Sequence, residues 1–121
     1  MARALSLGSL VAIAALAAAC GGGGEPDLHS TFARIQREEA RIEHAEGGAR
    51  AAAQCPGGAE RCAEECAEGV LACDEVCDAA RTLCELAAGV DDRDARTRCD
   101  RATPRCGACR ATLAPRCGGT S

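Results

Sequence analysis

The sequence predicts an all-α protein: a disulfide-stapled antiparallel helical hairpin preceded by a linker helix. Residues that favour helices, Ala above all, dominate the chain, and its cysteines recur at steps of seven and four residues, which return to one face of a helix. Phe32 is the only aromatic residue, so a chain of 121 residues can build only a thin core. So small a core needs covalent cross-links, and the eleven cysteines can supply them as disulfides. Such a cysteine content also indicates an oxidising compartment.

The start of the chain has the composition of an export signal. Arg3 precedes an apolar, Ala-rich run that is too short for a good transmembrane span. The end of this run, from Leu16 onward, and the following Cys20 resemble the lipobox of bacterial lipoproteins, in which small residues precede a cysteine that is lipidated and becomes the mature N-terminus. Ala17 departs from that pattern, which usually has a larger aliphatic residue there. We therefore predict a lipoprotein signal peptide at 1–19 and lipidation of Cys20; the alternative is an ordinary signal peptide.

A flexible Gly-rich tether is predicted at 20–27 and an amphipathic linker helix at 28–54. Four consecutive glycines fold poorly on their own and suit the attachment of an anchored domain. In the helix, apolar residues fall on one stripe, with Arg and Glu around the rest. Asp27 or Ser30 can cap its start, and Gly47-Gly48 is expected to interrupt it.

The apolar stripe of this helix has a seven-residue repeat formed by Leu28, Ile35, Ile42 and Ala49. Such a repeat is also found in coiled coils, although so few heptads are weak evidence for one. We favour a helix that packs on the hairpin or stays mobile. A homo-oligomer through Leu28, Ile35 and Ile42 is the less favoured alternative.

Residues 55–121 form the predicted Cys-rich hairpin, which begins with a Pro-Gly-Gly turn. Its first helix is expected over 59–88, where good helix formers continue until Gly89 can end it. A second helix follows over about 93–113. Pro104 lies inside this second segment, so it either kinks the helix or restarts it.

The numbering of the cysteines predicts their pairing. In an antiparallel pair of helices, residues at one height have numbers with a constant sum. That sum is 183 for three cysteine pairs and 182 for a fourth, and two cysteines beside the Pro-Gly-Gly turn remain for a local bridge. The predicted disulfides are Cys84–Cys99, Cys77–Cys106, Cys66–Cys117, Cys73–Cys109 and Cys55–Cys62. On an ideal helix Cys109 lies about 80° from the line of Cys99 and Cys117, so its bridge requires a rotation at Pro104 or Gly107.

The charge distribution supports the same hairpin. Residues 55–92 carry ten acids and two Arg, whereas 93–121 carry two acids and seven Arg. We expect the acidic helix to face the basic one, with ion pairs between Glu85 and Arg98 and between Asp78 and Arg105, at the same sum of 183. Because the basic stretch has an acidic partner within the chain, nothing favours nucleic acid as a ligand.

No pattern for catalysis is present. Cys106-Gly107-Ala108-Cys109 has the spacing of thiol oxidoreductases, but no strand or βαβ pattern surrounds it. His29 and His44 lie on the polar part of the linker helix, far along the chain from the cysteines, and are expected to be exposed to solvent. We therefore predict no enzyme, no catalytic residue and no cofactor.

Thiolate metal binding is the main alternative function. Cysteines at i and i+4 line the interior of copper-storage four-helix bundles, and Cys62-Ala63-Glu64-Glu65-Cys66 resembles that pattern. Soft thiolates bind Cu(I) and Zn²⁺, but only when they are reduced. An exported location favours disulfides, so we predict no metal ligands.

Three features carry a resemblance to a known group of proteins: CDAARTLCELA at 77–87, RCDRA at 98–102, and the positions of Cys106 and Cys117. They resemble uncharacterised Cys-rich lipoproteins predicted from myxobacterial genomes, over about 66–117. The resemblance implies a lipobox, a charged linker helix and a Cys-paired helical hairpin, and it implies no known activity. The sequence thus predicts a membrane-anchored lipoprotein of the bacterial cell envelope, at the outer membrane or the periplasmic face, whose role is structural or interactive and whose membrane contact is the N-terminal lipid.

Overall fold

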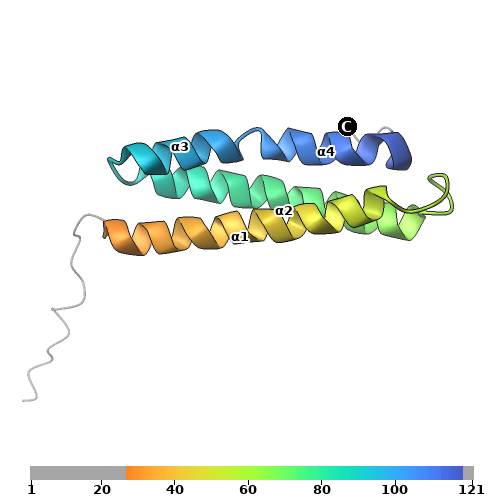
Figure 1. Ribbon diagram of the computed structural model, residues 1–121, viewed down its shortest axis with the longest axis horizontal. Coiled ribbons are helices and arrows are strands. Elements are labelled where there is room, and N and C mark those ends of the chain that lie inside the picture. Colours follow the sequence, from red (N-terminus) through yellow and green to blue (C-terminus); the bar gives the residue numbers. More distant parts are fainter. Residues whose placement is uncertain (1–26, 119–121) are drawn as a thin grey trace, which may run out of the picture.

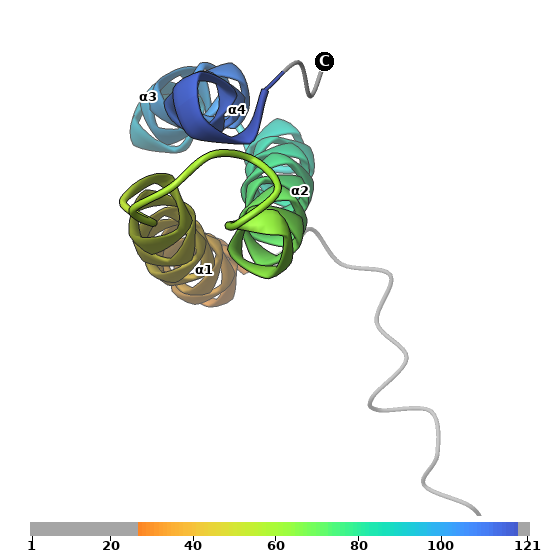
Figure 2. The same cartoon turned by 90° about the vertical axis from the view of Figure 1, so that its right-hand side faces the viewer.

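The computed structural model describes residues 27–118, which form helices and connecting turns without a strand. Its elements are α1 (Leu28–Ala53), α2 (Ala63–Ala88), α3 (Arg93–Ala102) and α4 (Arg105–Cys117). α3 and α4 follow each other almost end to end and make one broken rod (Figure 1). Seen along the bundle, α1, α2 and this rod stand at the corners of a triangle (Figure 2). The all-α fold and the antiparallel hairpin of α2 with α3 and α4 are as predicted.

α1 matches the predicted segment 28–54 but lacks the expected interruption. The carboxylate of Asp27 accepts hydrogen bonds from the backbone N–H groups of His29 and Ser30, both at 3.3 Å, so Asp27 is the N-cap. The expected interruption at Gly47-Gly48 was wrong, because the helix runs through both glycines to Ala53.

Tertiary packing explains why these glycines stay helical. Gly48 faces α2 closely enough that a Cβ on it would lie 3.6 Å from the Cβ of Ala72, and Ala45 and Ala49 beside it are buried. Each glycine costs a helix only about 1 kcal/mol relative to alanine. Burial of the small-residue face against α2 outweighs that cost.

α2 begins later than predicted. Residues 59–62 form turns, and the helix starts at Ala63 with Cys62 as its N-cap. The Cys62 N–H donates to the carbonyl of Gly58 at 3.0 Å, and the disulfide to Cys55 closes the same loop. The bridge closes this segment into a loop although its residues favour a helix.

The second rod of the hairpin breaks where Pro104 predicts. α3 ends with Thr103 as its C-cap, whose N–H donates to the carbonyl of Cys99 at 3.0 Å. Pro104 has no N–H and serves as the N-cap of α4, accepting a hydrogen bond from Ala108 N–H at 3.1 Å. α4 then continues past the expected end, through Pro115 to Cys117.

The core lies along the axis shared by the three rods. Among the described residues its largest fully buried side chains are Ile35, Ile42, Val76, Leu83, Leu113, Cys62 and Cys73. The heptad stripe of α1 therefore faces inward, and Ile35 and Ile42 are 0% exposed. Leu28, at the end of the stripe, is 46% exposed. Ile35 and Ile42 therefore pack within the chain, which is the favoured arrangement of this helix in the sequence analysis.

Gly69 marks the point where α1, α2 and α4 come closest. A Cβ on Gly69 would lie 2.8 Å from Ala52 Cβ and 2.8 Å from Leu113 Cδ2. No side chain tolerates such contacts, so the single glycine inside α2 permits the approach of both neighbours.

Candidate functional site: the disulfide ladder and its charged border

All ten cysteines of residues 27–118 are joined in five disulfides. The pairs are Cys84–Cys99, Cys77–Cys106, Cys73–Cys109, Cys66–Cys117 and Cys55–Cys62. Four are the pairs that the residue-number sums predict and the fifth is the predicted local bridge, with Cα–Cα distances from 4.6 to 6.1 Å. The first four join α2 to α3 or α4, and we call them the ladder. The fifth closes the loop between α1 and α2.

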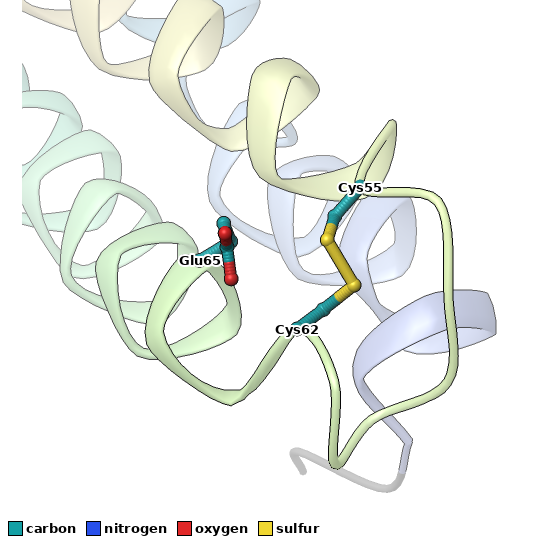
Figure 3. A group of neighbouring side chains, drawn as sticks. All are labelled: Cys55, Cys62 and Glu65. Carbon is teal, nitrogen blue, oxygen red and sulfur yellow. A yellow bond between two sulfur atoms is a disulfide. The ribbon is translucent and has the colours of Figure 1, made fainter.

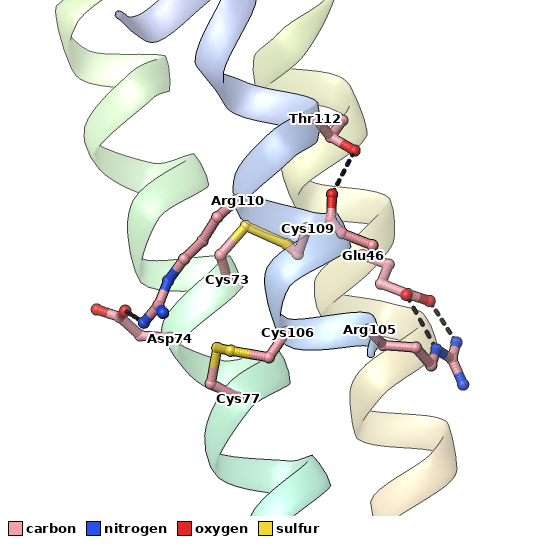
Figure 4. Close-up of a disulfide and its surroundings, with 10 residues drawn as sticks. Glu46, Cys73, Asp74, Cys77, Arg105, Cys106, Cys109, Arg110 and Thr112 are labelled. Carbon is pink, nitrogen blue, oxygen red and sulfur yellow. Dashed lines mark hydrogen bonds and ion pairs between the residues drawn. A yellow bond between two sulfur atoms is a disulfide. The ribbon is translucent and has the colours of Figure 1, made fainter. Parts of the chain in front are cut away.

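The rung with the poorest ideal geometry, Cys73–Cys109, is formed. Figure 4 shows Cys73–Cys109 and Cys77–Cys106 on successive turns between α2 and α4. Cys106, Cys109 and Cys117 all belong to α4, so the break at Pro104 does not change the angular offset of Cys109 from the other two. Cys73 and Cys109 are both buried, at 1% and 4% exposure, which makes this the innermost rung of the ladder.

The CxxC motif of α4 is structural in this arrangement. Cys106 pairs with Cys77 and Cys109 pairs with Cys73, so the motif contains no internal disulfide. Thiol oxidoreductases of the CxxC type cycle between a dithiol and a disulfide within the motif. Here both cysteines of the motif instead cross-link α4 to α2.

The ladder does not form a thiolate cluster either. Within residues 27–118, the only three Cys, His, Asp or Glu ligand atoms found within 4.8 Å of one another belong to Cys55, Cys62 and Glu65. These lie at the end of the bundle outside the ladder, and their two cysteines are disulfide-bonded. His29 and His44 are exposed, as expected.

The charged border between α1 and the second rod differs from the prediction. Arg98 does not pair with Glu85; it donates to Glu39 at 2.8 Å and stacks 5.4 Å above the ring of Phe32. Arg105 pairs with Glu46 and not with Asp78 (Figure 4). This hydrogen bond to Glu46 raises the pKa of Arg105.

The reason for this correction is the position of α1. Cysteines occupy the face of α3 and α4 that contacts α2, so the arginines beside that face point toward α1. α1 runs parallel to that rod and offers Glu39 and Glu46 along its length. Only Asp74 of α2 forms an ion pair with α4 in the described chain, to Arg110 at 3.7 Å.

Arg41 makes the corresponding link between α1 and α2. Its guanidinium lies 2.6 Å from Glu38, 2.7 Å from Glu75 and 3.2 Å from Asp78. The hydrogen bond to Glu75 is the main cause that raises the pKa of Arg41. Arg81, at 2.7 Å, followed by Arg41, lowers the pKa of Asp78 below its usual value.

Sequence reasoning missed the acids of α1, although a signal was present. Glu39 and Glu46 are seven residues apart, and so are Arg98 and Arg105. Each acid is separated from its Arg by 59 positions. A constant difference indicates parallel helices, just as a constant sum indicates antiparallel ones.

Open grooves lie on the described surface, and two of them border the charged residues of the bundle. One, of about 610 Å³, lies at the turn between α2 and α3 and is lined by residues that include Leu28, Val90 and Arg96. The other, of about 280 Å³, follows the border of α1 with the second rod beside Glu43 and Arg101. Neither brings together the nucleophile, base and anion-binding groups of a hydrolytic site.

The fold and the cross-links define a small, disulfide-stapled helical bundle. Five disulfides indicate an oxidising, extracytoplasmic compartment. No protein-family model, curated protein or solved structure matches the chain. Among residues 27–118, no helix combines the length and apolar content needed to cross a membrane. The predicted signal peptide and the predicted lipidation site, Cys20, lie outside the described residues.

Proposed function

We propose that this chain is a lipid-anchored lipoprotein of the bacterial cell envelope whose folded part is a rigid structural or interaction module. One observation carries the proposal: ten of the eleven cysteines pair with each other, and Cys20 is the one left over. That cysteine follows an exported-type apolar run and precedes four glycines. A lipid on Cys20 accounts for an odd cysteine in a compartment where thiols oxidise.

The bundle suits a module held at a distance from a membrane. The start of α1 and the turn between α2 and α3 lie at one end, and the loop between α1 and α2 lies at the other, beside the end of α4 (Figure 1). A helix of 26 residues, such as α1, is about 39 Å long. An anchor before α1 would let the Cys55–Cys62 loop reach up to about 40 Å beyond the start of α1.

Membrane fractionation and intact mass test the anchor. The wild-type chain should sediment with membranes and carry acyl chains, because each buried CH₂ group contributes about 0.8 kcal/mol to membrane binding. Cys20→Ser should release the chain or leave it unprocessed. Ala17→Leu is the matched control, because it places a larger aliphatic residue at the expected lipobox position and should keep the chain anchored.

A thiol count complements this experiment. Under denaturing, non-reducing conditions, the anchored protein should show no free thiol, since Cys20 is in a thioether and the other ten cysteines are in disulfides. A soluble, unacylated wild-type chain with one free thiol would contradict the lipid anchor. About ten free thiols would instead favour the thiolate metal-binding alternative.

A further inference from the structure

The end of the bundle opposite the predicted anchor brings a carboxylate next to a disulfide. Figure 3 shows Cys55 after α1, Cys62 before α2 and Glu65 in the first turn of α2. The two sulfurs and one carboxylate oxygen all lie within 4.8 Å of one another. The Cα atoms of the two cysteines are 6.1 Å apart, the widest spacing of the five pairs.

The two sulfurs are bonded to each other, so these three groups can hold a zinc ion only after the bridge opens. Zn²⁺ binds thiolates at about 2.3 Å and carboxylates at about 2.0–2.2 Å, so ligands of one tetrahedral ion lie roughly 3.5–3.8 Å apart. After the bridge opens, rotation of the two cysteine side chains would be enough to bring the sulfurs to this separation. Glu65 is exposed, so a fourth position on the ion would face solvent.

Other interactions hold both cysteines in place without the bridge between them. The carbonyl of Cys55 accepts a hydrogen bond from Arg116 Nη1 at 3.2 Å, which ties it to α4. The carbonyl of Cys62 accepts from Cys66 N–H at 2.7 Å, and Cys66 is itself cross-linked to Cys117. These two backbone hydrogen bonds do not depend on the local bridge.

The two thiolates would also have different environments. Cys62 is fully buried at the N-terminus of α2, where unpaired N–H groups and the helix dipole stabilise a negative charge. Cys55 is half-buried, which gives a reductant or a metal a route to the pair. Among the described groups, no ladder bridge has a third ligand at comparable distance.

We propose that the Cys55–Cys62 bridge is a redox-gated zinc site, with Glu65 as the third ligand and water as the fourth. A dithiol reductant supplies two electrons and two protons, becomes a cyclic disulfide and leaves two thiols at Cys55 and Cys62. Zn²⁺ then displaces both thiol protons and binds the two thiolates and the carboxylate. In the reverse step a disulfide oxidant accepts two electrons from the two thiolates and becomes a dithiol, which re-forms the Cys55–Cys62 bridge and releases the ion. This site does not depend on the lipid anchor.

The test uses the full chain after limited reduction with a dithiol. The species with two free thiols are separated, and peptide mapping identifies the one opened at Cys55 and Cys62. Zn²⁺ is titrated into it against a chromophoric chelator, and Co²⁺ is used as a spectroscopic probe of thiolate ligation. We expect one ion per chain in this species and none in the fully oxidised chain.

Variants separate the site from nonspecific thiolate binding. Glu65→Gln should weaken Zn²⁺ binding by about 10-fold or more, whereas Glu64→Gln, one residue away and equally exposed, should not. Cys55→His provides a second preparation that needs no reductant, because it retains Cys62 as a thiol and leaves the ladder oxidised. Binding that requires Glu65 in either preparation supports the site. Absence of binding in both, or equal affinity in Glu65→Gln, would overturn it.

Discussion

α2 is held along two sides by different means, and the contrast explains how so small a core folds. Toward α3 and α4 it has the four-rung ladder, with small residues such as Ala80 and Ala102 buried beside the rungs. Toward α1 no disulfide links the faces of the two helices. There the contact consists of buried aliphatic side chains, Ile35 and Ile42, and of ion pairs centred on Arg41.

Each side supplies what the other lacks. Disulfides need Cα atoms about 4.4–6.8 Å apart, which only small neighbours permit, so the ladder side has little side-chain volume to bury. The α1 side buries larger side chains and gains the hydrophobic free energy that the ladder does not. Cross-linking therefore dominates one side of α2 and aliphatic burial the other, although Cys73, Cys109 and Leu113 belong to the same core as Ile35 and Ile42.

Removing the ladder should have the largest effect. In the chain-entropy model, closure of a 15-residue loop such as that of Cys84–Cys99 stabilises a fold by about 3 kcal/mol, and a longer loop by about 4 kcal/mol. Full reduction should therefore lower the thermal midpoint, followed by circular dichroism at the helical signal, by about 20 °C or more. Treatment with a chelator is the control and should change nothing. A reduced chain with an unchanged midpoint would mean that the α1 contact suffices alone.

Removing a buried side chain from the contact between α1 and α2 should have the next largest effect on stability. Ile42→Ala removes a fully buried side chain between α1 and α2 and should cost about 2–5 kcal/mol in the free energy of unfolding. Leu71→Ala is the matched control: Leu71 is 68% exposed on α2, so its loss should cost less than about 0.5 kcal/mol. Urea unfolding of the oxidised chain measures both. Equal effects would place the stabilising burial elsewhere than along this stripe.

The difference between the ladder side and the α1 side of α2 also explains which contacts could be predicted from the sequence. The ladder follows from residue numbers, because a disulfide fixes two positions and a sum tests the register of both helices at once. The place of α1 did not follow in this way, since an apolar stripe shows which face is buried and not against what. Its acids at 39 and 46 match arginines at 98 and 105, but charges on flexible side chains have many alternative partners.

Helix ends and interruptions were the other weak point. Gly47-Gly48 was read as a break because glycine disfavours helices, yet neighbouring alanines bury that turn against α2. The start of α2 was placed too early because its residues favour a helix, while the local bridge keeps Cys62 at the end of a loop. In both cases tertiary contacts outweigh local preference by amounts that composition does not reveal.

Two glycines test how closely the two sides of α2 converge. Gly69→Ala would place a methyl group 2.8 Å from both Ala52 and Leu113, so we expect a loss of about 1–3 kcal/mol in the free energy of unfolding. Gly107→Ala lies in α4 with no atom within 4 Å of the new methyl group and should stabilise the chain by about 0.5–1 kcal/mol. Denaturant unfolding checks both signs. Stabilisation by Gly69→Ala would show that the three rods are more loosely packed than these distances state.

The smallest expected effect is the pH dependence of the α1 contact at Asp78. Hydrogen bonds from Arg81 and Arg41 lower the pKa of this carboxyl below its usual 3.8. A carboxyl with a lowered pKa in the folded state stabilises the fold above its unfolded value, and that contribution is lost as the pH falls through the folded pKa.

Asp78→Asn should therefore lower the urea midpoint slightly at neutral pH, and the difference from the wild type should shrink once the pH is well below 3.8. Because the pair is half exposed, added salt should reduce the neutral-pH difference as well. Asp100→Asn serves as the control, since Asp100 is exposed and makes no ion pair among the described residues. A difference for Asp78→Asn that grows in acid would show that the carboxyl is not held by these arginines in the folded state. The charges between α1 and α2 would then add nothing to the stability that the burial of Ile35 and Ile42 provides.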